Sequence, residues 1–497
     1  MNDDNSKGQM RQNLNPSVEG VFLSLILLAS LALNLWNNNF PLHYHFDEAK
    51  KIHFIKESTQ DFGHPLMMLQ LVRMARSVFK GSDVLFLGRV ISAILGTGIV
   101  LLSFLIARGI LKRKYALFAA VAVAVSPIVV IHAHYLKEDI IATFFMMGAL
   151  YFFLKFLRKD SRNHLILLGV ATGLACSSQY KSFLLFFLYS LCPFLVPSLI
   201  KSLKKYFKKL ALILIIAVVV FCLIDWPMLF DFKVLIKGVV FETKHAFHGH
   251  DIRFYPLDFL FSFHLFHSIT PGITLPLTLL GLAYIVFALL RWKSLIWQER
   301  ILISYVLLFY FSTELMILKP FPDFMRYMIP IVPIVLNFSC ALVQKIEDSI
   351  RSGKRKYAVY LLAVALLPSL HDTILLDDNL NKDTRAILEA WIVQNKQKTI
   401  GEGYTTKNKG LYKTVISLGQ IDIEEARRAG VTCMIASSFM YDRFLWGGSL
   451  KKQKPGVYKY CEQYKRIFKY PYIEIKPVFK SFAFSNPTIR IIRIAEP

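Results

Sequence analysis

The sequence lacks the short motifs that mark common nucleotide-binding and metal-dependent enzymes. No Gly-x-x-x-x-Gly-Lys-Ser/Thr loop, Rossmann glycine pattern or His-Glu-x-x-His pair occurs in its 497 residues. ATP-driven pumping and zinc proteolysis therefore have no support in the sequence. Zinc-finger, RRM and basic-zipper patterns are missing as well, so the net charge of +25 does not indicate a nucleic-acid partner.

Acidic residues are scarce, with 34 Asp and Glu against 59 Lys and Arg, and 55% of the residues are hydrophobic. The mean hydropathy is +0.44. A soluble chain of this composition could not cover its surface with polar groups. The apolar residues come in runs of about 20, which is the length that spans a bilayer. The sequence therefore predicts a polytopic α-helical membrane protein.

We expect about eleven transmembrane helices. The first run has no signal-peptide cleavage pattern, so we interpret it as a retained span. The runs centre near 18–36, 86–107, 115–132, 139–155, 165–178, 183–200, 210–225, 270–290, 299–318, 327–344 and 357–370.

The basic residues gather in alternate loops, and the intervening short loops carry only one or two each. This asymmetry predicts a cytoplasmic N-terminus, because basic loops stay on the cytoplasmic side. An odd number of spans then puts the C-terminus outside, which for the inner membrane of a bacterium is the periplasm. The basic loops are 108–114, 155–162, 201–209, 291–300 and 345–356.

Three segments are expected outside: 37–85, 226–268 and the tail from 371. We divide the chain into a membrane domain, 1–370, and a soluble α/β domain, 371–497. Strands are predicted within 413–418, 431–438 and 488–494, and a helix over 422–430 that stops at Gly430. Polar residues recur at helical spacing over 65–80, which predicts a helix lying in the membrane interface or packed on other protein.

An acidic pair, Asp47 and Glu48, follows the first span. A carboxylate in a half-dry site can accept a proton from an attacking hydroxyl or amine. The alternative is a solvated loop pair. The stretch 137–139 (Lys-Glu-Asp) begins another span, where acidic residues also favour a helix N-terminus.

Two cations lie near span ends on the same predicted side. Lys181 stands between two apolar runs, where it either snorkels to the interface or holds a phosphate. Arg326 suits bidentate phosphate contact, although Asp323 at i, i−3 is an alternative partner. Together with the acidic pair, these cations predict a site for an anionic lipid head group.

The sequence gives no specific metal site. The loop 245–256 holds three histidines and an aspartate, but their spacing matches no zinc pattern. Four of the six cysteines lie in apolar runs. Cys433 and Cys461 lie in the polar tail, where a disulfide and separate thiols are both open, and the apolar neighbours of Cys433 favour a buried thiol.

Several stretches resemble the GT-C class of integral-membrane glycosyltransferases that use polyprenyl-phosphate sugars, and in particular the family-39-like enzymes that include the lipid A aminoarabinose transferase. Two positions depart from the family pattern: Leu66 replaces a second proline, and Tyr180 precedes Lys181 where the family has Lys-Tyr. The resembling stretches are Asp47-Glu48, "GHPL" (63–66), "YLKED" (135–139), "GLACSSQYKS" (173–182), "MRYMIPIVP" (325–333) and "DTRAILEAWIVQN" (383–395).

This resemblance implies a GT-C fold with interfacial helices in the first outer loop and a soluble domain outside. It implies a donor made of a monosaccharide on a polyprenyl phosphate, a lipid, glycan or protein acceptor, and no cofactor. Asp47 would be the catalytic base, assisted by Glu48. The substrate-binding residues would be Lys181, Arg326, Lys137, Asp139, His64, Tyr327 and Tyr180.

A non-enzymatic transporter or lipid flippase is the competing prediction, because it would also use charges near the membrane. Such proteins more often show internal repeats and spans broken near the middle of the bilayer. Here the candidate charges cluster near one membrane face, which favours the enzyme.

Overall fold

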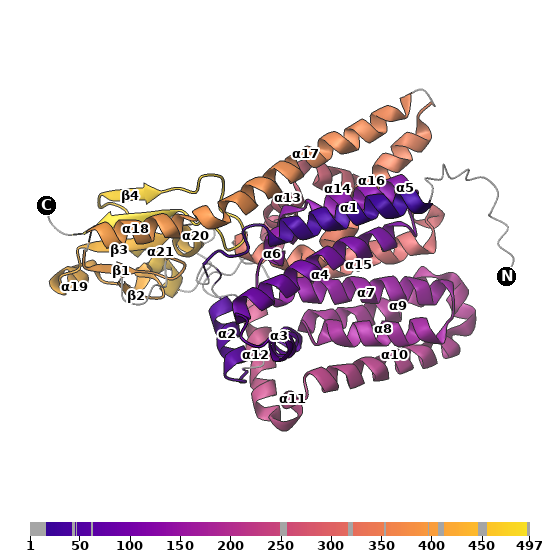
Figure 1. Ribbon diagram of the computed structural model, residues 1–497, viewed down its shortest axis with the longest axis horizontal. Coiled ribbons are helices and arrows are strands. Elements are labelled where there is room, and N and C mark those ends of the chain that lie inside the picture. The colour runs from indigo at the N-terminus through magenta and orange to yellow at the C-terminus, as the bar shows by residue number, and fades with distance from the viewer. Residues whose placement is uncertain are drawn as a thin grey trace.

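The computed structural model describes residues 16–41, 45, 47–60, 63–248, 256–316, 322–351, 354–395, 397–405, 412–445 and 455–494. Figure 1 shows a bundle of long helices that run in similar directions, with a small sheet domain at one end. We call this end of the bundle the sheet-domain end. The fold is therefore the predicted one, a helical membrane core with a separate α/β domain.

Every predicted apolar run coincides with helix. Six helices of the described residues are long and apolar enough to cross a membrane, or up to eight if each bent pair is one span. The number of eleven crossings stays a prediction. The helices of the bundle are α1 (Pro16–Leu35), α4 (Val84–Ala107), α5 (Arg113–Ala124), α6 (Pro127–Ala133), α7 (Glu138–Arg158), α8 (Arg162–Cys176), α9 (Leu184–Leu195), α10 (Leu203–Ile224), α13 (Thr270–Ile273), α14 (Leu275–Leu290), α15 (Trp297–Met316), α16 (Val332–Ser349) and α17 (Lys356–Asp378).

Two spans are bent rather than straight. α5 and α6 meet at 54°, where Pro127 opens the second helix, and residues 265–273 meet α14 at 117°. Thr274, at the second bend, has a φ of 70°, which is uncommon for a residue with a side chain. Short 3₁₀ turns join other spans, among them η2 (Tyr180–Phe183), η3 (Pro197–Ser202) and η7 (Pro322–Ile331).

Glycines set the closest approach between α8 and α10. A Cβ atom on Gly173 would lie 2.7 Å from the carbonyl oxygen of Ala217, and one on Gly169 would lie 2.8 Å from Ile216. These glycines are four residues apart, so they share one face of α8. Small residues at this spacing let membrane helices approach closely, which compensates for the absence of a hydrophobic driving force in lipid.

Short helices lie across the sheet-domain end of the bundle. They are α2 (Glu48–Lys56), α3 (Met67–Val78), α11 (Pro227–Phe230) and α12 (Phe232–His248), and Figure 1 shows α2 and α12 running across the direction of the long helices. The helix predicted over 65–80 is confirmed as α3. Met68 and Val72 are buried, whereas Met74 and Val78 are exposed. Exposed apolar side chains of this kind are expected on a helix that lies against lipid head groups.

The sheet domain begins where the bundle ends. The predicted boundary after residue 370 falls within α17, which continues to Asp378. The strand order is β2-β1-β3-β5-β4, in which β1, β2 and β3 are parallel and β5 is antiparallel to both neighbours. The elements are η9 (Asn379–Lys382), α18 (Thr384–Asn395), β1 (Thr399–Gly401), β2 (Lys413–Thr414), α19 (Ile423–Arg428), β3 (Cys433–Ser437), α20 (Ser438–Leu445), α21 (Pro455–Ile467), β4 (Tyr472–Ile475) and β5 (Ile489–Arg493).

Three predicted strands and one predicted helix appear in this domain. They are β2, β3, β5 and α19, and Gly430 ends the helix turn with a φ of 74°. β1, β4, α20 and α21 were not predicted. Cys433 and Cys461 are both free and buried, so the domain holds no disulfide between them.

Candidate active site

Charged residues from α2 and the start of α7 meet at the sheet-domain end. Nζ of Lys137 lies 2.7 Å from Oδ2 of Asp47 and 3.3 Å from Oε2 of Glu138, which also pairs with Lys51. Lys137 and Glu138 are almost fully buried, whereas the side chain of Asp47 keeps 30% of its surface exposed. Asp47 is thus the acid of this group that solvent or a substrate can reach.

The acidic pair is divided between two environments. Glu48 is completely buried and forms a bidentate pair with Arg89, through Nε–Oε1 and Nη2–Oε2 distances of 3.0 and 2.6 Å. The backbone N–H of Leu136 donates to the same carboxylate at 2.9 Å. Because both oxygens of Glu48 are engaged, this side chain ties α2 to α4 and to the segment before α7. Its assistance to Asp47 in catalysis stays a prediction.

The charge of Asp47 is strongly favoured. Burial disfavours the ionised form, but Lys137, His45 and Arg326 outweigh this effect and hold the pKa of Asp47 well below its usual range. Burial, with Lys137 and Lys51, lowers the pKa of the partly buried His64 well below its usual value. The site thus combines an ionised aspartate with a neutral histidine at neutral pH.

A second group of charges joins α7, η2 and η7. Asp139 accepts a hydrogen bond from Nε2 of Gln179 at 3.1 Å, and its other oxygen lies 3.9 Å from Nε of Arg326. Nζ of Lys181 donates to the carbonyl oxygen of Tyr327 at 2.9 Å. The predicted cations Lys181 and Arg326, 145 positions apart in the chain, therefore both lie near one residue, Tyr327. Its ring centroid is 5.5 Å from Nζ of Lys181 and 5.2 Å from the guanidinium carbon of Arg326.

Tyr180 takes a different position from its neighbour Lys181. It is partly buried and packs against the apolar cluster that includes Leu66, Met68 and Val72. This cluster lies beneath the short helices α2 and α3. Tyr180 therefore supports the surface layer, and its predicted part in substrate binding stays a prediction.

The loop over 63–67 is fastened to the ends of two spans. The N–H of Leu66 donates to Oδ1 of the buried Asp225 at 2.6 Å, and the N–H of Met67 donates to the carbonyl oxygen of Ser177 at 2.9 Å. Asp225 ends α10 and Ser177 ends α8. These bonds hold His64 beside the charged site.

Several buried polar atoms near Asp139 have no hydrogen-bond partner among the described residues. They are Oδ2 of Asp139, Oε1 of Gln179, Nε2 of His132 and Oγ of Ser182. Buried polar atoms are rarely left unpaired, so such a group points to bound water or a polar ligand. The described residues contain no group of three or more His, Cys, Asp or Glu able to hold a metal, and the side chains of 245–256 and Lys319 lie outside the described part.

Several residues of this region were not among the predicted site residues, among them Arg89, Gln179, His45 and Phe484. Arg89 had a signal, because a charge inside an apolar run is a default functional candidate. Gln179 and His45 lie in stretches that stand out in the sequence because of their charged neighbours, Lys181 and the Asp47–Glu48 pair. Phe484 had no signal, because an aromatic residue near the end of the soluble domain gives no reason to expect it beside Arg326, where the ring centroid is 5.3 Å from the guanidinium carbon.

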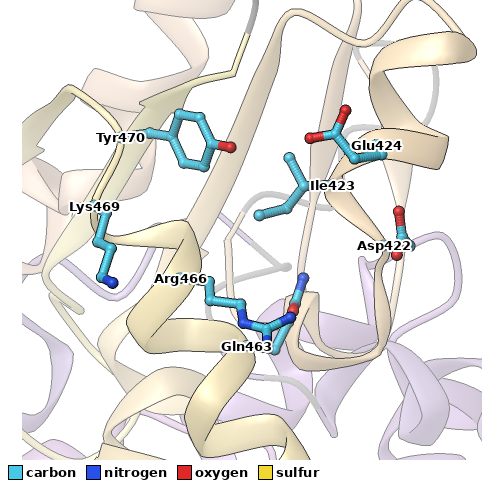
Figure 2. Close-up of a pocket in the computed structure, with 7 residues that line it drawn as sticks. All are labelled: Asp422, Ile423, Glu424, Gln463, Arg466, Lys469 and Tyr470. Atoms are coloured by element: carbon cyan, nitrogen blue, oxygen red, sulfur yellow. The ribbon is translucent and has the colours of Figure 1, made fainter.

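A separate cavity of about 320 Å³ lies on the sheet domain, between α19 and α21. Figure 2 shows Asp422, Ile423 and Glu424 on one side of it and Gln463 and Arg466 on another. Its lining carries both signs of charge, and none of the predicted site residues takes part.

Residues 63–226 match the family model of the dolichyl-phosphate-mannose-protein mannosyltransferases. This segment holds His64, Lys137, Asp139 and Lys181. No curated protein sequence matches the chain significantly.

Solved membrane glycosyltransferases share the fold. ArnT from Cupriavidus metallidurans, in its structure bound to undecaprenyl phosphate, is 13% identical and has a TM-score of 0.55, over 97% of this chain and 100% of that chain. The Archaeoglobus fulgidus oligosaccharyltransferase tethered with an acceptor peptide is 13% identical and has a TM-score of 0.58, over 94% and 74% of the two chains.

The helical membrane core, the appended sheet domain and the family match over 63–226 define the chain as a membrane glycosyltransferase with the GT-C fold. Within this class it is similar to ArnT over nearly its whole length. The predicted class, fold and enzymatic nature are thereby confirmed.

Proposed function

We propose that the enzyme moves a monosaccharide from a polyprenyl-phosphate donor to a lipid, glycan or protein acceptor on the extracytoplasmic side of the inner membrane, with Asp47 as the general base. The observation that carries this proposal is the ion pair of the accessible Asp47 with the buried Lys137 at 2.7 Å, near Arg326, which in turn lies near Lys181. A carboxylate can activate an acceptor, and cations can stabilise a departing phosphate.

The site holds several cations that could receive an anionic substrate: Lys51, Lys137, Lys181 and Arg326. They lie among the carboxylates of Asp47, Glu138 and Asp139, and Glu242 is near Tyr327. The remaining pair, Glu48 with Arg89, is neutral as a unit. A phosphate brought among these groups would find charge-assisted hydrogen bonds from more than one segment of the chain.

Binding of the donor would also make Asp47 a stronger base. In the resting site the pKa of Asp47 is held well below its usual range, chiefly by Lys137 against the effect of burial, and a carboxylate of such low basicity is a weak proton acceptor. A phosphate that draws Lys137 toward itself would weaken the pair with Asp47 and raise its pKa. Donor binding would in this way activate the base.

The chemical step is then a displacement at the anomeric carbon. The acceptor oxygen or nitrogen forms a bond to that carbon, and the bond from the carbon to the phosphate oxygen breaks. The electron pair of the broken bond stays on the phosphate, where Lys137, Arg326 and Lys181 stabilise it. The proton of the acceptor goes to the carboxylate of Asp47.

Two related structures support a lipid-phosphate donor. ArnT was solved with undecaprenyl phosphate, and the archaeal oligosaccharyltransferase AglB with dolichol phosphate, at 13% and 12% identity to this chain. The basic loops support the orientation, because they alternate along the chain in the manner that places a C-terminal sheet domain outside.

The test is transfer by the purified protein in nanodiscs. With a polyprenyl-phosphate sugar and extracted envelope lipids, glycans or peptides, mass spectrometry should find an acceptor heavier by one sugar residue and the free polyprenyl phosphate. A transporter or flippase would move the lipid between leaflets and leave its sugar–phosphate bond intact. That result would refute the proposed function.

A further inference from the structure

A loop of the sheet domain enters the membrane core. Phe482, Ala483 and Phe484 are at most 3% exposed and belong to the same apolar cluster as the long helices. Paired backbone hydrogen bonds between Phe482 and Ser485, of 3.2 and 2.9 Å, close the loop. Ala483 and Asn486 have φ angles of 50° and 53°, a region that non-glycine residues enter only where other contacts fix them.

A buried ion pair provides these contacts. Asp383 and Arg385 are completely buried and bond to each other through Nε–Oδ1 and Nη2–Oδ2 distances of 2.8 and 2.7 Å. Arg385 also donates to the carbonyl oxygen of Phe484 at 2.7 Å, and the N–H of Asn486 donates to Asp383 at 2.7 Å. The pair thus fixes the loop on both sides of Phe484.

The ring of Phe484 reaches the candidate active site. Its centroid lies 3.9 Å from that of the His45 imidazole, and 6.2 Å edge-on from that of Tyr135. The guanidinium carbon of Arg326 lies 5.3 Å from the same centroid and 5.2 Å from that of Tyr327. Two aromatic rings therefore hold Arg326, one from the membrane core and one from the sheet domain.

We propose that Phe484 is a positioning residue for Arg326, and that the sheet domain in this way completes the site for the donor phosphate. The inference rests on the proposed function. A guanidinium beside an aromatic face within about 6 Å is attracted by the ring. Bidentate phosphate contact requires the planar fork of arginine to point in one direction. The ring of Phe484 supplies this direction without touching the phosphate.

The competing explanation is that Phe484 only fills space, and substitutions that remove the same volume at two neighbouring positions separate the two explanations. Phe484→Leu removes the aromatic face, and Phe484→Tyr keeps it. Phe482→Leu is the matched control, because Phe482 lies two residues away in the same loop, is equally buried, and has Lys480 rather than Arg326 as its described cationic neighbour. Undecaprenyl phosphate is the probe, with the full-length protein in nanodiscs.

We expect Phe484→Leu to weaken binding of undecaprenyl phosphate about 2- to 30-fold, the range of one cation–π contact. The donor KM should rise and kcat should fall, because Arg326 also stabilises the departing phosphate, whereas the acceptor KM should change little. Phe482→Leu should bind as the wild type does, and Phe484→Tyr should restore binding to within about twofold. In an Arg326→Gln background, Phe484→Leu should have no further effect on binding, because the residue acts through Arg326.

Equal losses in Phe484→Leu and Phe482→Leu would show that only packing matters and would overturn the inference, as would unchanged binding in Phe484→Leu. If Phe484→Leu lowers the unfolding temperature, Phe484→Met repeats the test with a side chain that fills irregular space more readily. A wild-type protein that does not bind undecaprenyl phosphate at all would instead overturn the proposed donor, and this inference with it.

Discussion

Replacing Asp47 by Asn should separate the chemical step from donor binding. Asn has nearly the same shape as Asp but can neither accept the acceptor's proton nor carry a charge. Asp47 is partly exposed, at 30%, and its carboxylate is not part of the buried Glu48–Arg89 pair. The variant should therefore fold as the wild type does, and its loss of activity should appear as a lower kcat.

The magnitudes follow from the two roles of the carboxylate. Loss of a general base costs about 10²- to 10⁴-fold in rate. Loss of a partly exposed ion pair is worth about 1 kcal/mol or less. Here that loss releases Lys137 for the phosphate, so undecaprenyl phosphate should bind as tightly or up to about fivefold more tightly.

The assay needs both quantities from one preparation. Single-turnover transfer gives the chemical rate, and titration with undecaprenyl phosphate in nanodiscs gives the affinity. Asp231→Asn serves as the matched control, because Asp231 lies just before α12 at the same end of the bundle and, among the described residues, its Oδ1 accepts a hydrogen bond from the N–H of Val234 alone. Wild-type turnover in Asp47→Asn would refute the base, and a large loss of phosphate affinity would refute the competition between Asp47 and phosphate for Lys137.

Four further predictions test neighbouring parts of the structure. Lys137→Met should move the acid limb of the kcat/KM profile to higher pH, because the pKa of Asp47 lies below its usual range only while cations outweigh burial. The acid limb of the wild type should lie below pH ~4. Measuring turnover against pH in the variant and the wild type checks these two expectations. Arg326→Lys should weaken undecaprenyl phosphate binding about tenfold by titration, since a point charge does not replace the fork. Arg89→Met should lower the free energy of unfolding by about 3–5 kcal/mol, because it leaves Glu48 buried without its partner, and Glu48→Met with Arg89→Met should recover most of this loss in thermal unfolding. A reporter fused after Pro497 should be active only outside the cytoplasm, and cytoplasmic activity would contradict an odd number of spans.

The membrane core was predictable because its signal is one of composition. Long apolar runs have to form helices in lipid, where every backbone polar group needs a partner within the same segment. The breaks between helices were harder to predict. Pro271, Gly272 and Pro276 mark a break around Thr274, but the bend of 117° and the positive φ of Thr274 appear only in the folded chain. In the sheet domain, β1 has three residues and gives little pattern to detect.

The site was predictable only where charge stands against an apolar background. Lys181, Arg326 and the pair at 47–48 were found in this way, and each lies among the charges of the site. How the predicted residues pair was not predicted, because Asp139 and Arg326 come from segments almost 190 positions apart and only the folded chain brings them within 3.9 Å. The different surroundings of Asp47 and Glu48 also depend on the fold, since one residue of helix rotation directs Glu48 toward Arg89 and leaves Asp47 at the surface.

The cations of the site already have partners before a donor binds, and this affects the donor's affinity. Lys137 is paired with Asp47 and Glu138, Arg326 lies beside Asp139, and Lys181 donates to a carbonyl oxygen. A charge near the membrane is costly unless it is paired, so these contacts let the site exist before the donor arrives. A phosphate must then exchange partners with carboxylates that are already in place, and the net gain from the head group is small. We therefore infer that the polyprenyl tail provides most of the donor's affinity, whereas the exchange of partners provides the change in charge at Asp47 that the reaction needs.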